Sequence, residues 1–395
     1  MHHREMMPNP ERLLVIAGEL SGDRYAAALV SELRNAGPVE IMAIGGPLLH
    51  GMADRFLGDC TGFTSVGVRS MTNMRSIFKV FDVMETAVAE SPVRQAIIVD
   101  FPHYNFEIAR RLKKNKIPIT TVITPNFWIW NDRRAAKKIA HYSDKIVTIF
   151  PGEYKLYQSI GATTAYFGNP LVDLMPPLPA GVQRPHLNDG TDRPIRVGLF
   201  PGSRASELKL LLRPTIEAAA VLAERSPRFE FVIPMARDEF RSWVDQELTR
   251  CQLSSVTVAP PLTAEQMAAL DFAICATGTM TLELVLNRVP MIVLGALSPL
   301  SYWLATRVLR IKIPFCGLPN LVAGRQVVPE FMQSGIQPIP IADAVCHHLR
   351  PESQELQQTH YSELINILRG ESTSSVVSQI VSWITPSNGP QSIGV

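Results

Sequence analysis

The chain has 395 residues, a length that exceeds one ordinary hydrophobic core and predicts two or three domains. An apolar fraction of 46% is typical of a soluble α/β protein, and a net charge of +2 provides no protein-wide field for nucleic acid. The five cysteines are scattered without a C-x-x-C pair, which indicates reduced thiols in a cytosolic protein and disfavours a metal site. The first eleven residues lack the apolar core of a signal peptide.

The first half of the chain alternates short apolar strands with helices. Strands are expected at residues 13–17, 41–44, 96–99, 119–123 and 145–150, and helices at about 24–35 and up to about 114. Continuous apolar strands separated by helices indicate a parallel sheet that is covered on both faces. We therefore expect residues 1–175 to form a doubly wound, Rossmann-like domain.

Residues 68–85 form a predicted amphipathic helix. With 100° per residue, its apolar side chains fall on one face within about 140°. They are Met71, Met74, Ile77, Phe78, Phe81 and Met84. Arg69, Arg75 and Lys79 lie on the other face. Two interpretations are open: the apolar face packs on the N-terminal core, or Met71, Met74, Phe78 and Phe81 contact an anionic membrane surface.

A proline-rich segment with few apolar residues interrupts the alternation at residues 176–194 and predicts an interdomain linker. The pattern restarts at Ile195, so we expect a C-terminal Rossmann-like domain at 195–370, then a helix and tail at 371–395. The uncharged stretch 289–306 is interrupted by prolines and a glycine. It predicts a buried strand at 291–294 and a short helix from Leu300, in place of a membrane span.

Two strand–turn–helix segments carry the clearest functional signal. The first passes through Pro201-Gly202-Ser203-Arg204, and the second through Thr277-Gly278-Thr279 to Glu283. Backbone N–H groups at a helix start and the helix dipole both favour an anion. Arg204 adds a planar, permanently charged group suited to phosphate, whereas Glu283, one turn into its helix, is placed for sugar hydroxyls. The two turns predict a phosphate-bearing ligand at the strand ends.

Several common ligand motifs are absent from the sequence. No G-x-G-x-x-G follows the first strand and no G-x-x-x-x-G-K-[ST] occurs, so a dinucleotide site and a P-loop lose their main support. No D-x-D occurs, which disfavours a metal-bridged nucleotide sugar. No G-x-S-x-G elbow occurs either, which disfavours a serine hydrolase. Two doubly wound domains joined by one linker place a ligand in the cleft between the carboxyl ends of their strands.

Further motifs occur in a fixed order along most of the chain. In the first half they are Ala17-Gly18-Glu19, Ser21-Gly22-Asp23, Ile44-Gly45-Gly46-Pro47, Phe150-Pro151-Gly152-Glu153 and Gly168-Asn169-Pro170-Leu171-Val172-Asp173. In the second half they are Pro201-Gly202-Ser203-Arg204 with Glu207, Thr277-Gly278-Thr279 with Glu283, and Leu318-Pro319-Asn320 with Val328-Pro329-Glu330. This ordered set resembles the lipid-A-disaccharide synthases, which are inverting glycosyltransferases of the GT-B fold.

The resemblance implies two Rossmann-like domains that face a central cleft, and a hexosyltransferase that needs no metal or other cofactor. Its donor would be UDP-2,3-diacylglucosamine and its acceptor the acylated glucosamine 1-phosphate, 2,3-diacylglucosamine 1-phosphate. The products of this step of lipid A biosynthesis would be UDP and a β-linked disaccharide 1-phosphate. The resemblance also implies a cytoplasmic protein bound peripherally to the inner membrane. The true acceptor, the acyl-chain lengths and the oligomeric state, a homodimer included, stay open.

Carried over by position, the resemblance implies two sets of site residues. The substrate-binding residues are Gly18, Gly202, Ser203, Arg204, Gly278, Thr279, Glu283 and Asn320. The catalytic residues are Ser21, Asp100 and His103. Structural interpretations stay open: Ser21 and Asp23 as helix caps, Arg204 as an ion pair, Glu283 as an exposed helix charge and Asn320 as a turn-holding residue. For Trp128 and Trp130, a place in the core or in the cleft wall is the preferred interpretation, and contact with acyl chains is the alternative.

The chain departs from the family pattern at His103. The family usually has an aspartate between the proline and the aromatic residue of this loop, and that aspartate is its leading candidate base. A histidine side chain, with an ordinary pKa of about 6.5 against about 3.9 for aspartate, can also accept a proton from an acceptor hydroxyl. It can equally be an ordinary loop histidine, or indicate a different acceptor or a lost activity. Arg69 stands where the family tends to have an acidic residue.

Two other function classes stay open. A UDP-N-acetylglucosamine 2-epimerase on the same fold would need no lipid acceptor and no membrane-facing surface. A non-catalytic relative that binds a UDP-sugar or a lipid would be stabilised by its ligand without turnover.

Overall fold

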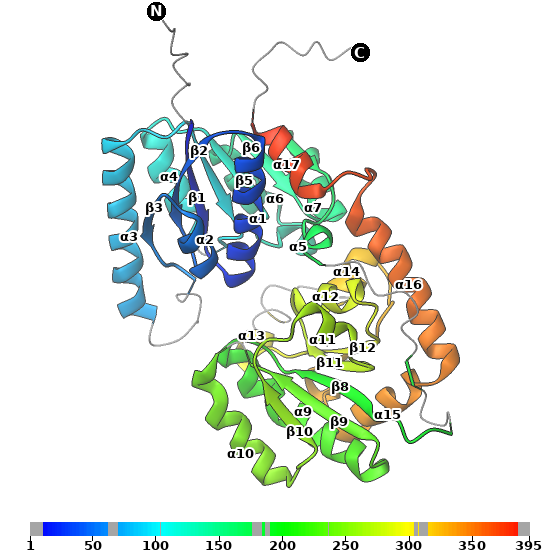
Figure 1. The fold of residues 1–395 in the computed structure, drawn as a ribbon. Helices are drawn as coiled ribbons and strands as arrows, with labels where there is room; N and C mark the ends of the chain where they lie inside the picture. The colour runs from blue at the N-terminus through cyan, green and yellow to red at the C-terminus, as the bar shows by residue number, and fades with distance from the viewer. Residues whose placement is uncertain are drawn as a thin grey trace, which may run out of the picture. The chain divides into compact units, whose positions relative to one another are not determined.

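A computed structural model describes residues 11–61, 70–102, 104–175, 184–185, 190–235, 237–303, 307 and 315–385, with the backbone alone for 70–74, 300 and 301. The chain divides into two compact units. Unit 1 contains residues 1–174 and 368–395, and unit 2 contains residues 175–367. The chain therefore leaves unit 1 once and returns to it near the end. Figure 1 shows the elements of each unit.

Unit 1 is built on a seven-stranded sheet in the order β3-β2-β1-β4-β5-β6-β7, and every strand pair is parallel. The strands are β1 Glu11–Ala17, β2 Val39–Ile44, β3 Arg55–Gly58, β4 Gln95–Val99, β5 Ile119–Val122, β6 Lys145–Thr148 and β7 Thr164–Tyr166. The central strands are buried on both faces, since residues 13–17 and 96–99 are almost inaccessible to solvent. That burial explains their continuous apolar sequence.

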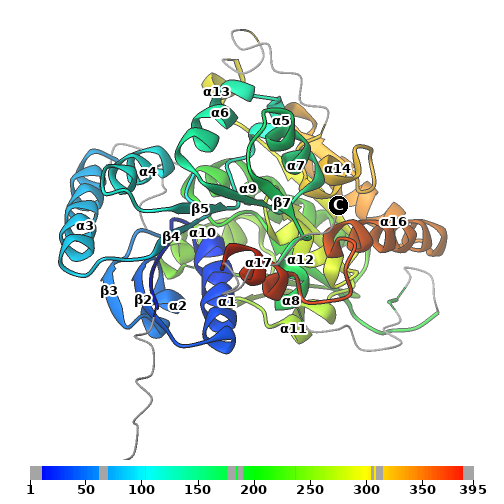
Figure 2. The ribbon, with the colours of Figure 1, turned by 90° about the horizontal axis from the view of Figure 1, so that it is seen from above.

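Helices cover both faces of this sheet. They are α1 Leu20–Ala36, α2 Pro47–Met52, α3 Ser70–Glu90, α4 Asn105–Lys114, α5 Phe127–Trp130, α6 Arg133–Tyr142, α7 Pro151–Ser159, α8 Leu171–Leu174 and α17 Val376–Ile384. Figure 2 shows α3 and α4 together on one side of the sheet and α1 and α17 on the other. The first helix begins at Leu20, earlier than expected, because two residues after β1 complete the turn.

The predicted amphipathic helix exists as α3, and its apolar face packs on the core of unit 1. Ile77, Phe81 and Met84 are fully buried there, and Phe81 lies edge-on to the rings of Phe101 and Tyr104. The expectation that Phe81 contacts a membrane is therefore wrong, because burial in the core removes its ring from the surface. Phe78 is half-buried against the same core. The side chains of Met71 and Met74 lie outside the described part of the structure.

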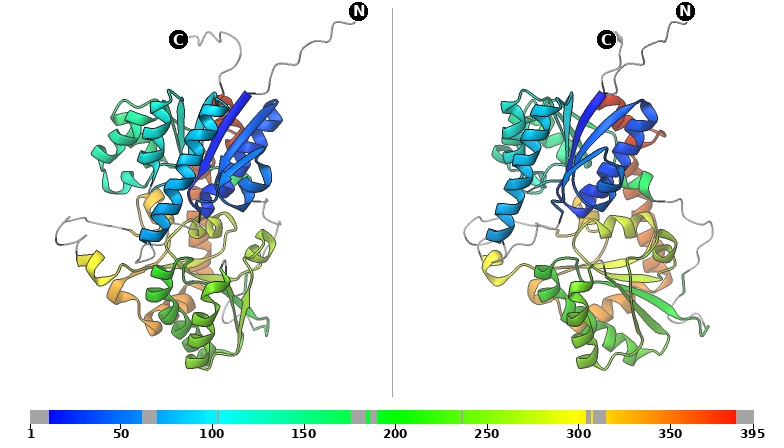
Figure 3. Two further views of the ribbon diagram at one scale, coloured as in Figure 1. Left: turned by 90° about the vertical axis from the view of Figure 1, so that its left-hand side faces the viewer. Right: turned by 60° about the vertical axis from the view of Figure 1, so that its left-hand side comes forward.

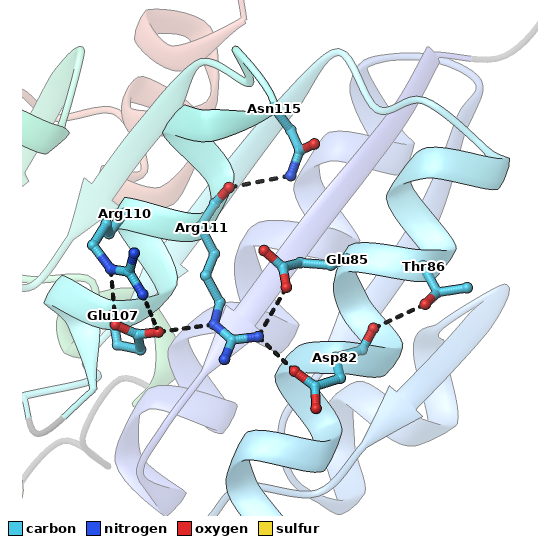
Figure 4. Close-up of polar contacts among 7 residues, drawn as sticks. All are labelled: Asp82, Glu85, Thr86, Glu107, Arg110, Arg111 and Asn115. Carbon is cyan, nitrogen blue, oxygen red and sulfur yellow. Dashed lines mark hydrogen bonds and ion pairs between the residues drawn. The ribbon is translucent and has the colours of Figure 1, made fainter.

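Arg111 on α4 fastens α3 to α4 (Figure 4). Its guanidinium binds Asp82 Oδ1 at 2.7 Å, Glu85 Oε2 at 2.9 Å and Glu107 Oε1 at 2.9 Å. It also lies 5.7 Å from the ring centroids of Phe78 and Phe81. Hydrogen bonds from Arg110 and then Arg111 lower the pKa of Glu107 to about 2. One cation thus joins two carboxylates of α3 to the helix that follows the candidate catalytic loop.

Unit 2 is built on a six-stranded parallel sheet in the order β10-β9-β8-β11-β12-β13. Its strands are β8 Ile195–Phe200, β9 Phe229–Pro234, β10 Val256–Ala259, β11 Phe272–Ala276, β12 Met291–Gly295 and β13 Glu330–Met332. Its helices are α9 Ala205–Arg225, α10 Arg241–Cys251, α11 Ala264–Ala268, α12 Met280–Leu286, α13 Pro299–Trp303, α14 Leu318–Ala323, α15 Pro338–His348 and α16 Pro351–Arg369. Two 3₁₀ turns, Asp238–Phe240 and Gln333–Gly335, complete the unit.

The uncharged stretch 289–306 behaves as expected where it is described. It supplies the buried strand β12 and then the short helix α13. Among the described helices, none is both long and apolar enough to cross a membrane.

The helix α16 carries the chain from unit 2 back to unit 1. In unit 2, Gln357 Nε2 donates to Met291 O, and Tyr361 O–H donates to Val289 O. At its end, Leu368 O accepts from Asn169 N at 2.6 Å. Gly168 has a φ of +119°, and a Cβ there would lie 2.7 Å from Leu368 O. The Gly168-Asn169 motif is therefore the place where unit 1 receives the returning chain, which requires the absence of a side chain.

We expect Arg111→Ala to lower the free energy of unfolding by about 2–3 kcal/mol, because the change leaves three carboxylates without a shared cation. The side chain of Arg111 is 13% exposed. The matched control is Arg110→Ala, whose 46% exposed side chain binds Glu107 alone and whose loss should cost clearly less. Urea unfolding followed by circular dichroism measures both. Equal losses for the two variants would contradict the role of Arg111.

Candidate functional site

The carboxyl ends of β1 and β4 lie side by side in unit 1 and bring two predicted catalytic residues together. Ala17 pairs with Val99, so the segments that follow start next to each other. Ser21 Oγ donates a hydrogen bond to Asp100 Oδ2 at 2.8 Å. Asp100 has a φ of +44°, a conformation that costs energy outside glycine but which Asp tolerates better than most residues. The pair is a hydroxyl and carboxylate fixed at the sheet edge.

Gly18 sits between β1 and α1, directly against the loop that follows β4. A Cβ at this position would lie 1.7 Å from Cδ2 of Phe101, and Phe101 itself is fully buried. Any side chain at position 18 would therefore displace the Phe101 ring and with it the start of the candidate catalytic loop. Packing against Phe101 is therefore sufficient to require a glycine at position 18. The role of Gly18 in substrate binding stays a prediction.

Asp23 holds a neighbouring loop instead of capping α1. Its Oδ1 accepts from Gly46 N at 2.9 Å and Leu49 N at 3.1 Å, and its Oδ2 accepts from Leu48 N at 2.9 Å. These donors belong to the start of α2, so Asp23 caps α2 from α1. The N-cap of α1 is Glu19, whose side chain makes no capping hydrogen bond. Capping of α1 by Ser21 or Asp23 is therefore wrong.

His103 lies outside the described residues, but its neighbours on both sides are placed. Tyr104 is half-buried and packs 5.8 Å from the Phe101 ring centroid. Asn105 is the first residue of α4 and is buried, and its Nδ2 has no hydrogen-bond partner among the described residues. Asn105 is not among the site residues expected from the sequence. The available signal was a polar residue at the start of an otherwise apolar helix face.

Glu153, in the Phe150-Pro151-Gly152-Glu153 motif, joins the ends of β5 and β6. Its carboxylate accepts from Thr124 N at 3.0 Å, Thr124 Oγ1 at 2.6 Å and Ile149 N at 2.9 Å. The side chain is fully buried. Burial raises its pKa to about 7, against the opposing effect of these hydrogen bonds. The motif thus has a structural role, because Glu153 holds the segments that follow β5 and β6 together.

The two tryptophans of the segment after β5 have different surroundings. The ring of Trp128 lies 5.7 Å from that of Phe150, and a Cβ on Gly152 would approach Trp128 Cε3 to 2.5 Å. Trp128 therefore packs against other residues of unit 1, in agreement with its interpretation as a core or cleft-wall residue. Trp130 is exposed.

The two glycine turns of unit 2 lie next to each other. Phe200, the last residue of β8, pairs with Cys275 near the end of β11. Parallel pairing therefore places Gly202–Arg204 beside Thr277–Thr279 at one sheet edge. Burial first, then the charges of Glu283 and Glu207, raise the pKa of the Cys275 thiol, so both carboxylates lie near this strand end. The structure brings the predicted donor residues of these turns together.

Glu207 occupies the start of α9. Its Oε2 accepts from Ser203 N at 2.9 Å and Arg204 N at 3.3 Å, while Arg204 Nη1 lies 3.3 Å from its Oε1. Gly202 has a φ of +115°, and a Cβ there would collide with Glu207. The anion-favouring helix start is thus bound by a carboxylate of the chain itself, with the exposed Arg204 folded toward it.

The second turn is open above its glycine. Gly278 has a φ of +143°, and a Cβ there would meet no atom of the described residues within 4 Å. The glycine is required by its backbone conformation, and the free space lets a ligand approach the backbone closely. Thr281 Oγ1 donates to Gly278 O at 2.7 Å and holds the turn. Thr279 makes no side-chain capping bond, and Glu283 is half-buried in the first turn of α12.

Asn320 is a structural residue, which corrects its predicted contact with the substrate. Its Oδ1 accepts from Val327 N at 2.7 Å and Val328 N at 2.9 Å. Its Nδ2 donates to Val328 O at 2.9 Å and Glu330 Oε1 at 2.7 Å. The side chain is fully buried, and all its donors and acceptors are used. It therefore holds the loop before β13, with no capacity left for a ligand.

No group of three or more His, Cys, Asp and Glu residues within the described ranges is arranged to hold a metal ion.

Two α/β units, each built on a parallel sheet, define a class of protein, the GT-B fold. Among solved structures, MurG of Acinetobacter baumannii is similar with a TM-score of 0.55 and 11% identity, covering 95% of this chain and 99% of that one. A UDP-N-acetylglucosamine 2-epimerase of Neisseria meningitidis has a TM-score of 0.55 and 13% identity, covering 94% and 98%. At these identities the likeness shows the fold alone, which transferases and epimerases share.

The family follows from sequence. The family described as lipid-A-disaccharide synthetase matches residues 13–384. A lipid-A-disaccharide synthase of Anaeromyxobacter sp. (strain K) is 35% identical over 86% of this chain and 88% of its own length. The chain belongs to the lipid-A-disaccharide synthase family. It is a glycosyltransferase of lipid A disaccharide synthesis, and the epimerase alternative is not favoured.

The buried Glu153 predicts a component of stability that falls as the pH rises. Its folded-state pKa of about 7 lies above the ordinary 4.5, so the folded chain keeps a proton that the unfolded chain releases between these values. The free energy of unfolding should therefore fall by about 3 kcal/mol more in the native chain than in Glu153→Gln from pH 4.5 to 7.5. Urea unfolding at several pH values measures this, with the exposed Glu90→Gln as control. Parallel curves for the native chain and Glu153→Gln would rule out the raised pKa.

Asn320→Ala should lower the free energy of unfolding by about 2–4 kcal/mol, since each of the four buried hydrogen bonds contributes about 1 kcal/mol. The control is Gln337→Ala, an exposed amide in the same unit with one side-chain bond to Ser334 O. Thermal and urea unfolding provide the measurement. If Asn320→Ala instead kept native stability and raised the KM for the donor, Asn320 would be a substrate-binding residue after all.

Proposed function

We propose that this chain transfers 2,3-diacylglucosamine from UDP to 2,3-diacylglucosamine 1-phosphate. The acceptor hydroxyl loses its proton to a base, and its oxygen bonds to C1 of the donor sugar. The bond from C1 to the UDP oxygen breaks on the opposite face, and UDP leaves with the electron pair. Family membership carries this proposal, and the paired turns of unit 2 support it.

We propose that unit 2 binds the donor. Negative charge builds on the UDP phosphates as the bond breaks, and groups that favour this charge accelerate the reaction. A helix start contributes about 0.3–1 kcal/mol to an anion, and a hydrogen bond from Arg204 adds about 1.5–3 kcal/mol. These groups would take the place of a bridging metal. Gly278 would admit the ligand to the backbone, and Glu283 would accept hydrogen bonds from the sugar.

In this scheme the phosphates replace Glu207 at the start of α9. Both are oxyanions that accept from Ser203 N and Arg204 N, so the exchange leaves no donor unpaired. Arg204 would turn from the carboxylate to the phosphate. The preformed turn needs no refolding, because Gly202 already has its left-handed conformation.

We propose that unit 1 binds and activates the acceptor. Ser21 and Asp100 lie at the strand ends next to the loop that contains His103. His103 would be the base, with Ser21 and Asp100 orienting the acceptor. A protein with acylated substrates must also reach a membrane, so we propose peripheral binding to the cytoplasmic face of the inner membrane, through Met71, Met74 and Phe78 at the start of α3. The exposed Arg75 and Lys79 would face anionic headgroups.

The decisive experiment is mass spectrometry of products from UDP-2,3-diacylglucosamine and a panel of lipid sugar 1-phosphates, with and without a chelator. A disaccharide 1-phosphate plus UDP, insensitive to the chelator, is expected. Formation of an epimer from UDP-N-acetylglucosamine alone would establish the rival activity instead. Stabilisation by UDP-sugar without any product would identify a binding protein.

His103→Ala should lower kcat by about 10²–10⁴, which is the usual contribution of a general base. His103→Asp should recover most of this loss. The acidic limb of the pH–rate profile should lie at lower pH for His103→Asp than for the native chain, because an aspartate ordinarily titrates near pH 3.9 and a histidine near 6.5. Steady-state assays from pH 4.5 to 8.5 measure this. Near-native turnover of His103→Ala would show that His103 is not the general base.

A further inference from the structure

Asn105, the first residue of α4, has a buried amide donor that the fold does not use. The residue is 1% exposed, and its Nδ2 has no hydrogen-bond partner within the described ranges. Most buried donors in native proteins are paired, because an unpaired one loses its bonds to water without replacement. A fold that keeps such a donor in spite of this cost indicates a partner outside the described residues, such as a ligand.

The amide belongs to the edge of the sheet that carries the candidate catalytic residues. Strands β1, β4 and β5 are parallel and point to the same end of unit 1 (Figure 3). Asn105 N donates to Phe101 O at 3.1 Å, so α4 starts one turn after β4. In a helix the Cα–Cβ bond leans toward the N-terminus. The side chain of this first residue is therefore directed back to the strand ends, where Ser21 binds Asp100.

The carboxylates that flank Asn105 in the sequence do not supply the missing acceptor. Glu107 accepts from Arg110 Nη2 at 2.8 Å and from Arg111 Nε at 2.9 Å, toward the interior of α4. Asp100 Oδ2 is bound by a hydroxyl of α1. The charges of these two acids disfavour an anionic ligand oxygen beside the amide. The donor is thus suited to an uncharged oxygen.

Strained backbone marks the same edge of unit 1. Asp100 and Ile123 follow the adjacent strands β4 and β5, and their φ angles are +44° and +63°. Asp100 N donates to Val122 O at 3.0 Å, so the two strained positions are neighbours. A left-handed conformation is unusual for any residue other than glycine, and most of all for a β-branched one. Such strain gathers at binding and catalytic sites, in agreement with a ligand at this edge.

We propose that Asn105 binds the acceptor sugar through a hydrogen bond from its Nδ2 to an uncharged sugar hydroxyl. The identity of the ligand rests on the proposed function. Because Nδ2 is covered in the free protein, acceptor binding shifts neighbouring side chains, and pairing of the donor favours that shift. The bond holds the sugar beside the strand end that carries Asp100. A buried donor of this kind also rejects an acceptor that lacks the matching hydroxyl, because it then stays unpaired.

The first test replaces Asn105 by leucine, which has nearly the same shape and no donor. For Asn105→Leu, kcat/KM for 2,3-diacylglucosamine 1-phosphate should fall about five- to tenfold, the usual effect of one hydrogen bond, while the KM for the UDP-sugar stays native. The Tm without ligand should be native or higher, because the change removes an unpaired buried donor. Steady-state kinetics with each substrate varied in turn, and thermal unfolding, measure these effects.

The matched control is Asn115→Leu at the other end of α4, where the exposed Asn115 donates to Arg111 O at 3.1 Å. This variant should keep native kinetics with both substrates. Asn105→Asp is the second variant, since an aspartate fits the same space, suits a helix start and cannot donate when ionised. It should lose at least as much kcat/KM for the acceptor. Native acceptor kinetics in either Asn105 variant overturn the proposal. So does a lowered Tm with equal losses for both substrates, which would give Asn105 a purely structural role.

Acceptors that each lack one hydroxyl identify the oxygen that Asn105 binds. One of them should be used by the native chain as poorly as Asn105→Leu uses the complete acceptor, and Asn105→Leu should show no further loss with it. If every deoxy acceptor lost the same factor in the native chain and in Asn105→Leu, the partner would not be a hydroxyl and the proposal would be overturned.

Binding without transfer separates this inference from the proposed function. The acceptor alone should raise the Tm of the native chain, and Asn105→Leu should lose most of that shift. Such a dependence on Asn105 in a chain that forms no disaccharide would leave the inference standing and refute the proposed function. Disaccharide formation by Asn105→Leu with native acceptor kinetics would support the function and overturn the inference.

Discussion

Parallel pairing of β8 with β11 is the constraint on which the candidate donor site depends. It sets Phe200 opposite Cys275, and thereby brings two turns that are about seventy-five residues apart to one edge. The same constraint acts in unit 1, where pairing of Ala17 with Val99 brings Ser21 to Asp100. Each turn alone is a short polar segment. The register of a buried parallel sheet brings these segments together into a candidate site.

Carboxylates that are buried or half-buried then hold the loops at these edges. Asp23 binds the start of α2, Glu153 binds Thr124 and Ile149, and Glu330 accepts from Cys316 N and Gly317 N. In each case an acid of a family motif satisfies backbone N–H groups that a loop cannot pair internally. These acids therefore shape the site without being free to act on a substrate. Glu207 does the same at α9, but at a position where a ligand could replace it.

The strands and the fold class could be predicted because parallel strands buried on both faces leave a local signature of continuous apolar residues. The roles of Asn320 and Gly168 could not, because their partners are set by tertiary structure. Asn320 bonds a loop that returns beside it, and Gly168 receives a helix two hundred residues away. The apolar face of α3 was ambiguous for a similar reason. Periodicity locates the face, but only the packing of Phe81 against Phe101 and Tyr104 decides what covers it.

In the proposed scheme, the start of α9 is both stable and ready for its ligand. An empty helix start would leave N–H groups exposed to water and a flexible glycine turn free to change conformation. Glu207 pairs those groups at 2.9 and 3.3 Å and fixes Gly202 in its left-handed conformation. A diphosphate carries more charge than one carboxylate and can bind several donors at once, so it can displace Glu207. The pairing with Arg204 is weak at the exposed surface, so the cost of moving that guanidinium to a phosphate is small.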